Sequence, residues 1–279
     1  MSVINTNVKS LIAQNALTVN NRSLSKAMEQ LSTGKRINTA ADDAAGLAIS
    51  DKMTSQIRGL NQAVRNANDG ISLVQTVEGA TQEVTNMLQR MRELAVQSSN
   101  DTYSSTDRSA LQLEFDQLTE EISRISTNTR WNNMQVFASG SAGIGSAFAV
   151  SLQVGMHGNS SDTITVTLQS ITASALSVSG LSLASHTSAA GVLSTIDSAI
   201  QTIDTFRANL GAWSNRLTYA ADNLSNVSQN TAASRSRILD ADYAAESTEL
   251  ARTQIIQQAA TAMLAQANQQ PQSVLTLLR

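Results

Sequence analysis

Apolar residues recur at spacings of three and four along most of the chain, a period that is typical of amphipathic helices. The first run starts after Thr6, a candidate helix cap, and stops at Gly34, a residue type that often ends helices. The sequence therefore predicts a first helix between these two residues. Its apolar positions are Val8, Leu11, Ile12, Leu17, Leu24, Met28 and Leu31.

A much longer run of the same kind covers about residues 44–100. Its spacings alternate between three and four and slip by three residues at Val77 and Ala80, which predicts a coiled-coil helix with one stammer. A continuous helix over this range would be about 85 Å long. A third helix is expected from near Ser105 to the polar stretch that begins at Ser126.

The carboxy-terminal part shows the helical period twice more. One stripe begins at Leu193, passes through Leu224 and predicts a fourth helix that continues to Ile238. The last stripe is the most regular, and Pro271 within it is expected to kink the helix because proline has no backbone N–H donor. This last stripe consists of Ile256, Ala260, Met263, Ala267, Gln270, Val274 and Leu277.

The middle of the chain, residues 132–190, is rich in Ser, Thr, Gly and Ala and changes to a period of two. Alternation over 148–154 and again over 164–168 predicts two strands, with the segment 155–162 as the hairpin turn. Helices from both chain ends must pair, which brings the termini together. We therefore expect a mainly α fold: a long antiparallel coiled-coil helix bundle formed by both chain ends, with a small β-hairpin element at the tip.

Composition agrees with a thin helical assembly. Only 3% of the residues are aromatic and 15% are charged, and cysteine is absent. The net charge of −3 is spread along the chain, so no basic surface for nucleic acid is expected. No apolar run reaches the roughly 18 residues of a membrane span, and the amino terminus lacks the pattern of a cleaved secretory signal. We expect no nucleic-acid or membrane partner.

The chain offers little for catalysis or metal binding. His157 and His186 stand apart from any acidic cluster, so ordinary surface positions are expected for both. Without cysteine, thiol chemistry is excluded, and two isolated histidines make a Ser-His-Asp site improbable. Adjacent carboxylates at 42–43 and 120–121 point about 100° apart on a helix, which favours solvated charge or helix-start roles. We expect no enzyme activity, no metal and no cofactor.

The two terminal helices carry more apolar rows than they can cover by pairing with each other. Such helices are unstable alone, because an isolated helix buries too little to offset its backbone entropy. We expect their apolar residues to pack between molecules. The candidate assembly residues are Leu11, Ile12, Leu17, Leu24, Leu31, Ile255, Ile256, Ala260, Met263, Leu264, Val274 and Leu277.

Both ends of the sequence resemble bacterial flagellins of a short form that lacks large variable outer domains. The amino-terminal segments VINTNVKSLIAQNAL (3–17) and LSTGKRINTAADDAAGLAISDKM (31–53) are similar to the start of that family. The segment from Ser234 to the final Leu-Leu-Arg is similar to its carboxy terminus over the whole length. The resemblance covers about residues 1–137 and 192–279 and fails only in the middle.

This resemblance implies a structural subunit of the flagellar filament, which serves motility outside the cell. Residues 1–43 with 241–279 would form the inner tube of the filament. Residues 44–240, with the hairpin region at about 132–190, would form its outer layer. Flagellins of this kind leave the cell unfolded through a type III export channel and polymerise beneath a cap. The implied partners are further copies of the chain, an export chaperone, the filament cap and the hook-filament junction proteins.

The resemblance also implies recognition by the vertebrate flagellin-sensing Toll-like receptor. Gln89, Arg90, Leu94 and Glu114 occupy the positions of the family's main receptor contacts, whereas Met91 replaces a smaller aliphatic residue. A packing role for Met91 and Leu94 in the long helix remains an alternative. Two further interpretations of the chain stay open: a hook-filament junction protein, which forms one short ring, and an enzyme within the middle segment.

Overall fold

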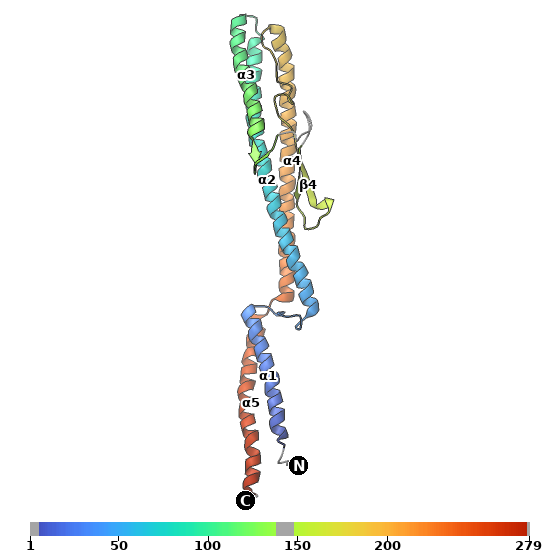
Figure 1. Ribbon diagram of the computed structural model, residues 1–279, viewed down its shortest axis with the longest axis vertical. Helices are drawn as coiled ribbons and strands as arrows, with labels where there is room; N and C mark the ends of the chain where they lie inside the picture. Colours follow the sequence, from blue (N-terminus) through green and yellow to red (C-terminus); the bar gives the residue numbers. More distant parts are fainter. Residues whose placement is uncertain (1–5, 138–147, 278–279) are drawn as a thin grey trace. The chain divides into compact units, whose positions relative to one another are not determined.

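The computed structural model describes residues 6–137 and 148–277, and the side chains of all these residues except 148 and 270–277 (Figure 1). The helices are α1 (Val8–Thr33), α2 (Ala44–Ser98), α3 (Ser105–Asn128), α4 (His186–Leu239) and α5 (Tyr243–Leu277). Short strands β1 (Arg130–Trp131) and β2 (Met134–Gln135) pair with each other, as do β3 (Phe148–Gln153) and β4 (Thr163–Leu168). The mainly helical fold predicted from the apolar periodicity is confirmed.

Helix ends follow local side-chain chemistry. Asn7, and not Thr6, caps α1, because its side-chain oxygen accepts a hydrogen bond from the Ser10 amide. Gly34 ends this helix as predicted, with a positive φ of 69° that suits a residue without a side chain. Ser104 and Asp107 form a reciprocal capping box at the start of α3.

The chain divides into two compact units, Met1–Ile57 with Gln229–Arg279, and Arg58–Ser228. In the first unit, α1 and α5 run side by side in opposite directions (Figure 1). The loop after α1 pairs with the link before α5 through a β-bridge between Lys35 and Asp240. Hydrogen bonds from the Arg36 amide to the Leu239 carbonyl (2.7 Å) and from the Ala241 amide to the Gly34 carbonyl (3.0 Å) complete this joint.

The second unit holds the continuous apolar core. The stripes predicted for the three long helices meet there; many of their larger members are fully or almost fully buried, and others are partly buried against them. Examples are Leu88, Met91 and Leu94 of α2, Phe115 and Ile122 of α3, and Ile196, Ile203 and Leu210 of α4. The segment 169–185, which carries no regular strand or helix, covers part of this core with the buried side chains of Ile171, Leu176, Val178 and Leu183.

The predicted hairpin is present, and its register pairs Val150 with Val166. It docks on the side of α2, where the Asn66 side-chain amide donates to the Gln153 carbonyl (2.9 Å) and Gly59 lies against Met156. The hairpin therefore lies beside residues 59–70 of α2, and not at the tip of the bundle. The physical reason is burial: the alternate β4 side chains need an apolar surface, and the glycines of α2 leave room for close approach.

Candidate assembly surface on the terminal helices

Side-chain hydrogen bonds link α1 to α5. The Asn20 side-chain amide donates to the Thr253 carbonyl (2.8 Å), and the Asn7 amide donates to the Ala267 carbonyl (2.9 Å). The Gln257 amide reaches Asn21 at 3.1 Å. These contacts join early α1 to late α5 and late α1 to early α5, so the pair is antiparallel.

The fully buried residues of this pair are small or polar. The buried residues of α1 are Asn20, Ala27 and Gln30, and among the described side chains of α5 only Thr253 is buried. Apolar burial supplies roughly 25 cal/mol per Å² and is the main favourable term in folding. Because its leucines are only half-buried, the interface contributes limited hydrophobic stability to the isolated subunit.

The apolar rows of the two helices face outward instead. Leu11 is 56% exposed, Ile12 65%, Ile255 66% and Met263 66%, values that are high for large apolar side chains. Ile256 is also exposed. Five other candidate assembly residues are half-buried: Leu17, Leu24, Leu31, Ala260 and Leu264. The last two candidates, Val274 and Leu277, lie outside the described side chains.

Two shallow grooves follow this exposed surface. One lies between Val19 of α1 and Ile256 of α5, and the other between Ala13 of α1 and Met263 of α5. Ile12 lines both grooves. Contiguous exposed apolar surface on a protein marks a site of interaction, because leaving it in water is unfavourable. The arrangement suits the side chains of another helix.

An ion pair ties the loop before α2 to α1. The Lys26 ammonium lies 2.8 Å from the Asp42 carboxylate, which also accepts hydrogen bonds from the backbone amides of Thr39 and Asn38. These contacts, led by the Lys26 bond, hold the pKa of Asp42 well below its usual range. Asp43 accepts a bond from the Gly46 amide (2.8 Å), so Asp43 has the helix-start role, one of the two roles expected for this acidic pair.

Three of the four predicted receptor positions are exposed, namely Gln89, Arg90 and Glu114. Arg90 bonds Glu114 of α3 at 2.8 Å and Glu93 at 2.9 Å, and these carboxylates, Glu114 first, raise the pKa of its guanidinium. Leu94 is only 1% exposed, so its side chain belongs to the helical core. The structure thus brings the two charged positions together and separates Leu94 from them by burial.

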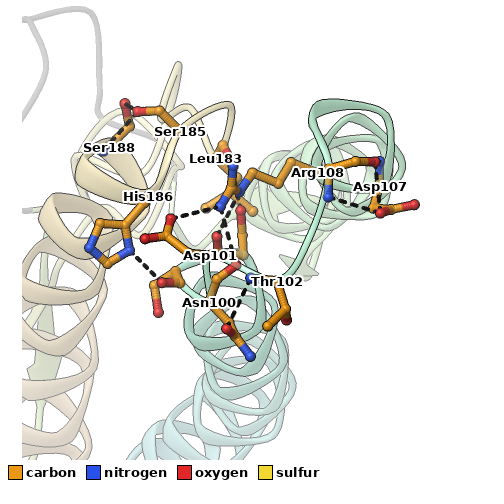
Figure 2. A network of polar contacts seen from close by, with 12 residues as sticks. Asn100, Asp101, Thr102, Asp107, Arg108, Leu183, Ser185, His186 and Ser188 are labelled. Atoms are coloured by element: carbon orange, nitrogen blue, oxygen red, sulfur yellow. Dashed lines mark hydrogen bonds and ion pairs between the residues drawn. The ribbon is translucent and has the colours of Figure 1, made fainter.

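Figure 2 shows a polar network where α2 ends, which the apolar pattern did not predict. Arg108 of α3 donates to the carbonyls of Ser98 (3.0 Å) and Asn100 (3.1 Å) and so satisfies acceptors that the helix end leaves free. His186 bonds the Ser99 carbonyl through Nδ1. Both Arg108 and His186 therefore stabilise a helix terminus here.

The described part of the chain offers no group of three or more His, Asp or Glu side chains that could hold a metal ion. Both histidines are exposed, as expected. Within the same residues, none of the helices combines the length and the apolar character that crossing a bilayer requires.

Comparisons with known proteins agree with the similarity of the chain ends. The bacterial flagellin N-terminal helical region matches residues 4–142, and the bacterial flagellin C-terminal helical region matches residues 193–278. A flagellin of Halalkalibacterium halodurans is 48% identical over 279 residues, covering 99% of this chain and 100% of that protein. The flagellar filament 33 kDa core protein of Treponema phagedenis is 43% identical over 285 residues, covering 99% of this chain and 100% of that protein.

Among solved structures, a crystal structure of Bacillus cereus flagellin aligns with a TM-score of 0.47 and 31% identity, covering 57% of this chain and 88% of that chain. The two family matches together cover well over half of the sequence, and the curated relatives match it over nearly its full length. Flagellins are structural proteins of the bacterial flagellum. The chain belongs to the bacterial flagellin family.

Proposed function

We propose that this chain is the structural subunit of a flagellar filament and polymerises through the outward apolar rows of α1 and α5. One observation carries the proposal. The α1–α5 pair buries small and polar residues while Leu11, Ile12, Ile255 and Met263 remain exposed. A helix pair whose apolar rows face outward needs neighbouring molecules to cover those rows, and further copies of the chain offer the same apolar rows.

The energetics favour coupled folding and assembly. Ordering a residue costs about 1–2 kcal/mol of backbone entropy, and a polar interface returns little of it. Fully burying one large apolar side chain contributes about 1.5–3 kcal/mol. Packing the exposed rows against neighbouring subunits therefore supplies the missing stability. In the free subunit the two terminal helices are largely unfolded, and they become helical on assembly.

The coupling of folding to assembly also accounts for the expected export route and for the expected layers of the filament. An end that folds only in the filament can pass unfolded through a type III export channel, with an export chaperone to cover it, and no cysteine is present to form a wrong disulfide. Polymerisation then takes place outside the cell, beneath a cap and beyond the junction proteins. Residues 1–43 with 241–279 form the inner tube, and residues 44–240 form the outer layer.

Recognition by the host flagellin-sensing Toll-like receptor is part of the proposal. Gln89, Arg90 and Glu114 offer exposed polar groups to a partner. Leu94 and Met91 are buried, so they act by holding α2 against the core and keeping those polar groups in place. The exposed polar side chains thus have the contact role, and the buried Leu94 and Met91 have the packing role.

Negative-stain microscopy of subunits after salting-out tests the proposal. Replacing Ile12 and Ile255 by Gln makes the outward rows polar, and this variant should form no long filaments. The matched control is Leu113→Gln, which makes the same kind of change at an exposed leucine of α3. The control and the unmodified chain should form long filaments. Normal filaments from the Ile12/Ile255 variant would reject the assembly surface, and short rings from the unmodified chain would indicate a junction protein.

A further inference from the structure

The contact between α1 and α5 has few fully buried apolar residues to define its helix register. In coiled coils, large apolar knobs fit into specific holes and so decide which residues face each other. Among the described residues of these two helices, the fully buried ones are small or polar, and the leucines Leu17, Leu24, Leu31, Leu250 and Leu264 are half-buried. These leucines recur at multiples of seven residues in each helix, so a shifted register would still bring leucines into the contact, and their packing alone does not fix the shift.

The apolar pattern of α5 does not define its inward face either. Ile255 and Ile256 are neighbours in sequence, as are Met263 and Leu264, and neighbouring residues on a helix point about 100° apart. Several faces of α5 are therefore similarly apolar. A rotated or shifted α5 would meet α1 with much the same composition.

Asn20 supplies the missing determinant. Its side chain is buried in the contact, and its amide donates to the Thr253 carbonyl at 2.8 Å. The Thr253 hydroxyl bonds carbonyls of its own helix, at 2.8 and 2.9 Å, so it does not compete for this amide. Glu249 and Gln257 lie about one helical turn to either side of Thr253. After a shift of one turn, one of these longer side chains would stand opposite Asn20 in place of Thr253 and would fill the space that the Asn20 side chain now takes. A shifted helix would leave a buried amide without an acceptor, which is unfavourable.

A second asparagine makes a hydrogen bond that fits the same register. The Asn7 side chain caps α1 through its oxygen, while its amide donates to the Ala267 carbonyl at 2.9 Å. The two asparagines are 13 residues apart in α1, and the two acceptor carbonyls are 14 residues apart in α5. The difference of one residue is a rise of about 1.5 Å along a helix. One antiparallel register therefore satisfies both bonds.

We propose that Asn20, with Asn7 as a second tie, fixes the register of α1 against α5 and thereby sets the position of the outward apolar rows. The partner of those rows is a second copy of the chain, so this inference rests on the proposed function. Only a subunit with the correct register presents Ile12 beside Met263 in the groove that a neighbour fills. The buried polar group contributes specificity, as a buried asparagine does in a coiled coil.

A spin-label distance tests the register directly, because the chain has no cysteine of its own. Glu29→Cys and Ala262→Cys place two nitroxides on exposed positions near opposite ends of the pair. Doubly labelled chains are assembled with a large excess of unlabelled chain, so that pulsed electron paramagnetic resonance reads distances within one subunit. The test variant is Asn20→Leu. The control is Gln14→Leu, which also replaces an amide side chain by leucine, at an exposed position of α1 that lines neither groove.

The labelled chain and the Gln14→Leu control should give one narrow distance. Asn20→Leu should give a broadened distribution with a second distance displaced by about 5.4 Å, one helical turn. A single unchanged distance in Asn20→Leu would overturn the inference. If this variant does not enter filaments, the same distances are read on free chains in an osmolyte that favours the folded pair, with the same two outcomes. Absence of filaments from the unlabelled chain would contradict the proposed function, and the osmolyte measurement would still decide the register.

Discussion

Leu152 of β3 packs against the backbone of Gly70 on α2, at the place where a side chain of residue 70 would stand. A Cβ atom built on Gly70 would lie 2.3 Å from Leu152 Cδ1 and 3.2 Å from Leu217 Cδ1. The first separation is far shorter than any real contact between carbon atoms. The glycine thus lets the hairpin and α4 approach α2 closely at one point.

Gly70→Ala should destabilise the second unit by comparison with Gly79→Ala. Alanine at either position favours the helix by about 0.5–1 kcal/mol. At Gly70 this gain is opposed by an overpacking cost of about 1–3 kcal/mol, whereas nothing lies within 4 Å of a Cβ at Gly79. Urea unfolding followed by circular dichroism should rank Gly79→Ala above Gly70→Ala. Equal or reversed stabilities would show that the contact with Leu152 does not limit the approach.

Arg90→Ala should reduce receptor signalling more than it reduces stability. Its bonds to Glu114 and Glu93 are solvent-exposed ion pairs, which contribute about 0–1 kcal/mol. Arg92→Ala is a matched control, because Arg92 is equally exposed and pairs with Asp197 of α4 at 2.7 Å. In a reporter-cell assay with purified subunits, Arg90→Ala should shift the dose response and Arg92→Ala should not. Identical dose responses would reject the assignment of Arg90.

Asp42→Asn should make the stability of the filament less dependent on pH in the acidic range. The pKa of Asp42 is lowered in the folded joint, chiefly by Lys26, whereas an unpaired aspartate titrates near 3.9. The ion pair therefore contributes fully above about pH 4 and is lost as the pH falls through the lower, folded pKa. The depolymerisation temperature, followed by light scattering, should be lower in Asp42→Asn at neutral pH.

That difference should shrink as the pH falls from about 4 toward the lower, folded pKa, because the unfolded chain then binds a proton at Asp42 that the folded joint does not. Asp51→Asn, at an exposed position of α2, removes one charge in the same unit without touching this ion pair. It should change the depolymerisation temperature little at any pH. A constant difference for Asp42→Asn over the whole pH range would argue against the ion pair as the cause.

Deleting Gln270 to Arg279 should prevent filament growth and leave residues 44–240 folded. These residues belong to the end of α5 and the chain terminus, which are part of the first unit. Electron microscopy should show no filaments, while the thermal transition of the soluble chain should stay unchanged. Filaments of normal length from the truncated chain would contradict this role.

The periodic parts of this fold could be predicted from sequence, because period is a local signal. The helices, the stop at Gly34 and the hairpin pairing Val150 with Val166 all follow from spacings of 3.5 or 2 and from turn chemistry. The Asn132–Asn133 turn between β1 and β2 was missed. Both residues have positive φ, so two consecutive asparagines were the available signal for that tight hairpin.

The non-local parts could not be predicted in this way. Spacing places Met263 on a regular row of α5 but does not say that the row faces outward, since apolar residues occur on several sides of the helix. The ties of Asn20 to Thr253 and of Arg108 to the end of α2 join polar residues that share no motif. Ile171 and Val178 cover the core from an irregular segment whose sequence shows no hydrophobic period.

In the proposed function the chain ends fold only when they assemble, and hydrogen exchange measures this directly. A verified monomer and the assembled filament are compared by mass spectrometry of peptides from both. We expect rapid exchange in residues 6–30 and 246–277 of the monomer, slow exchange there in the filament, and slow exchange in the core helices of both. Slow exchange of the terminal helices in the monomer would mean that they fold alone, and the account of coupled folding and assembly would be wrong.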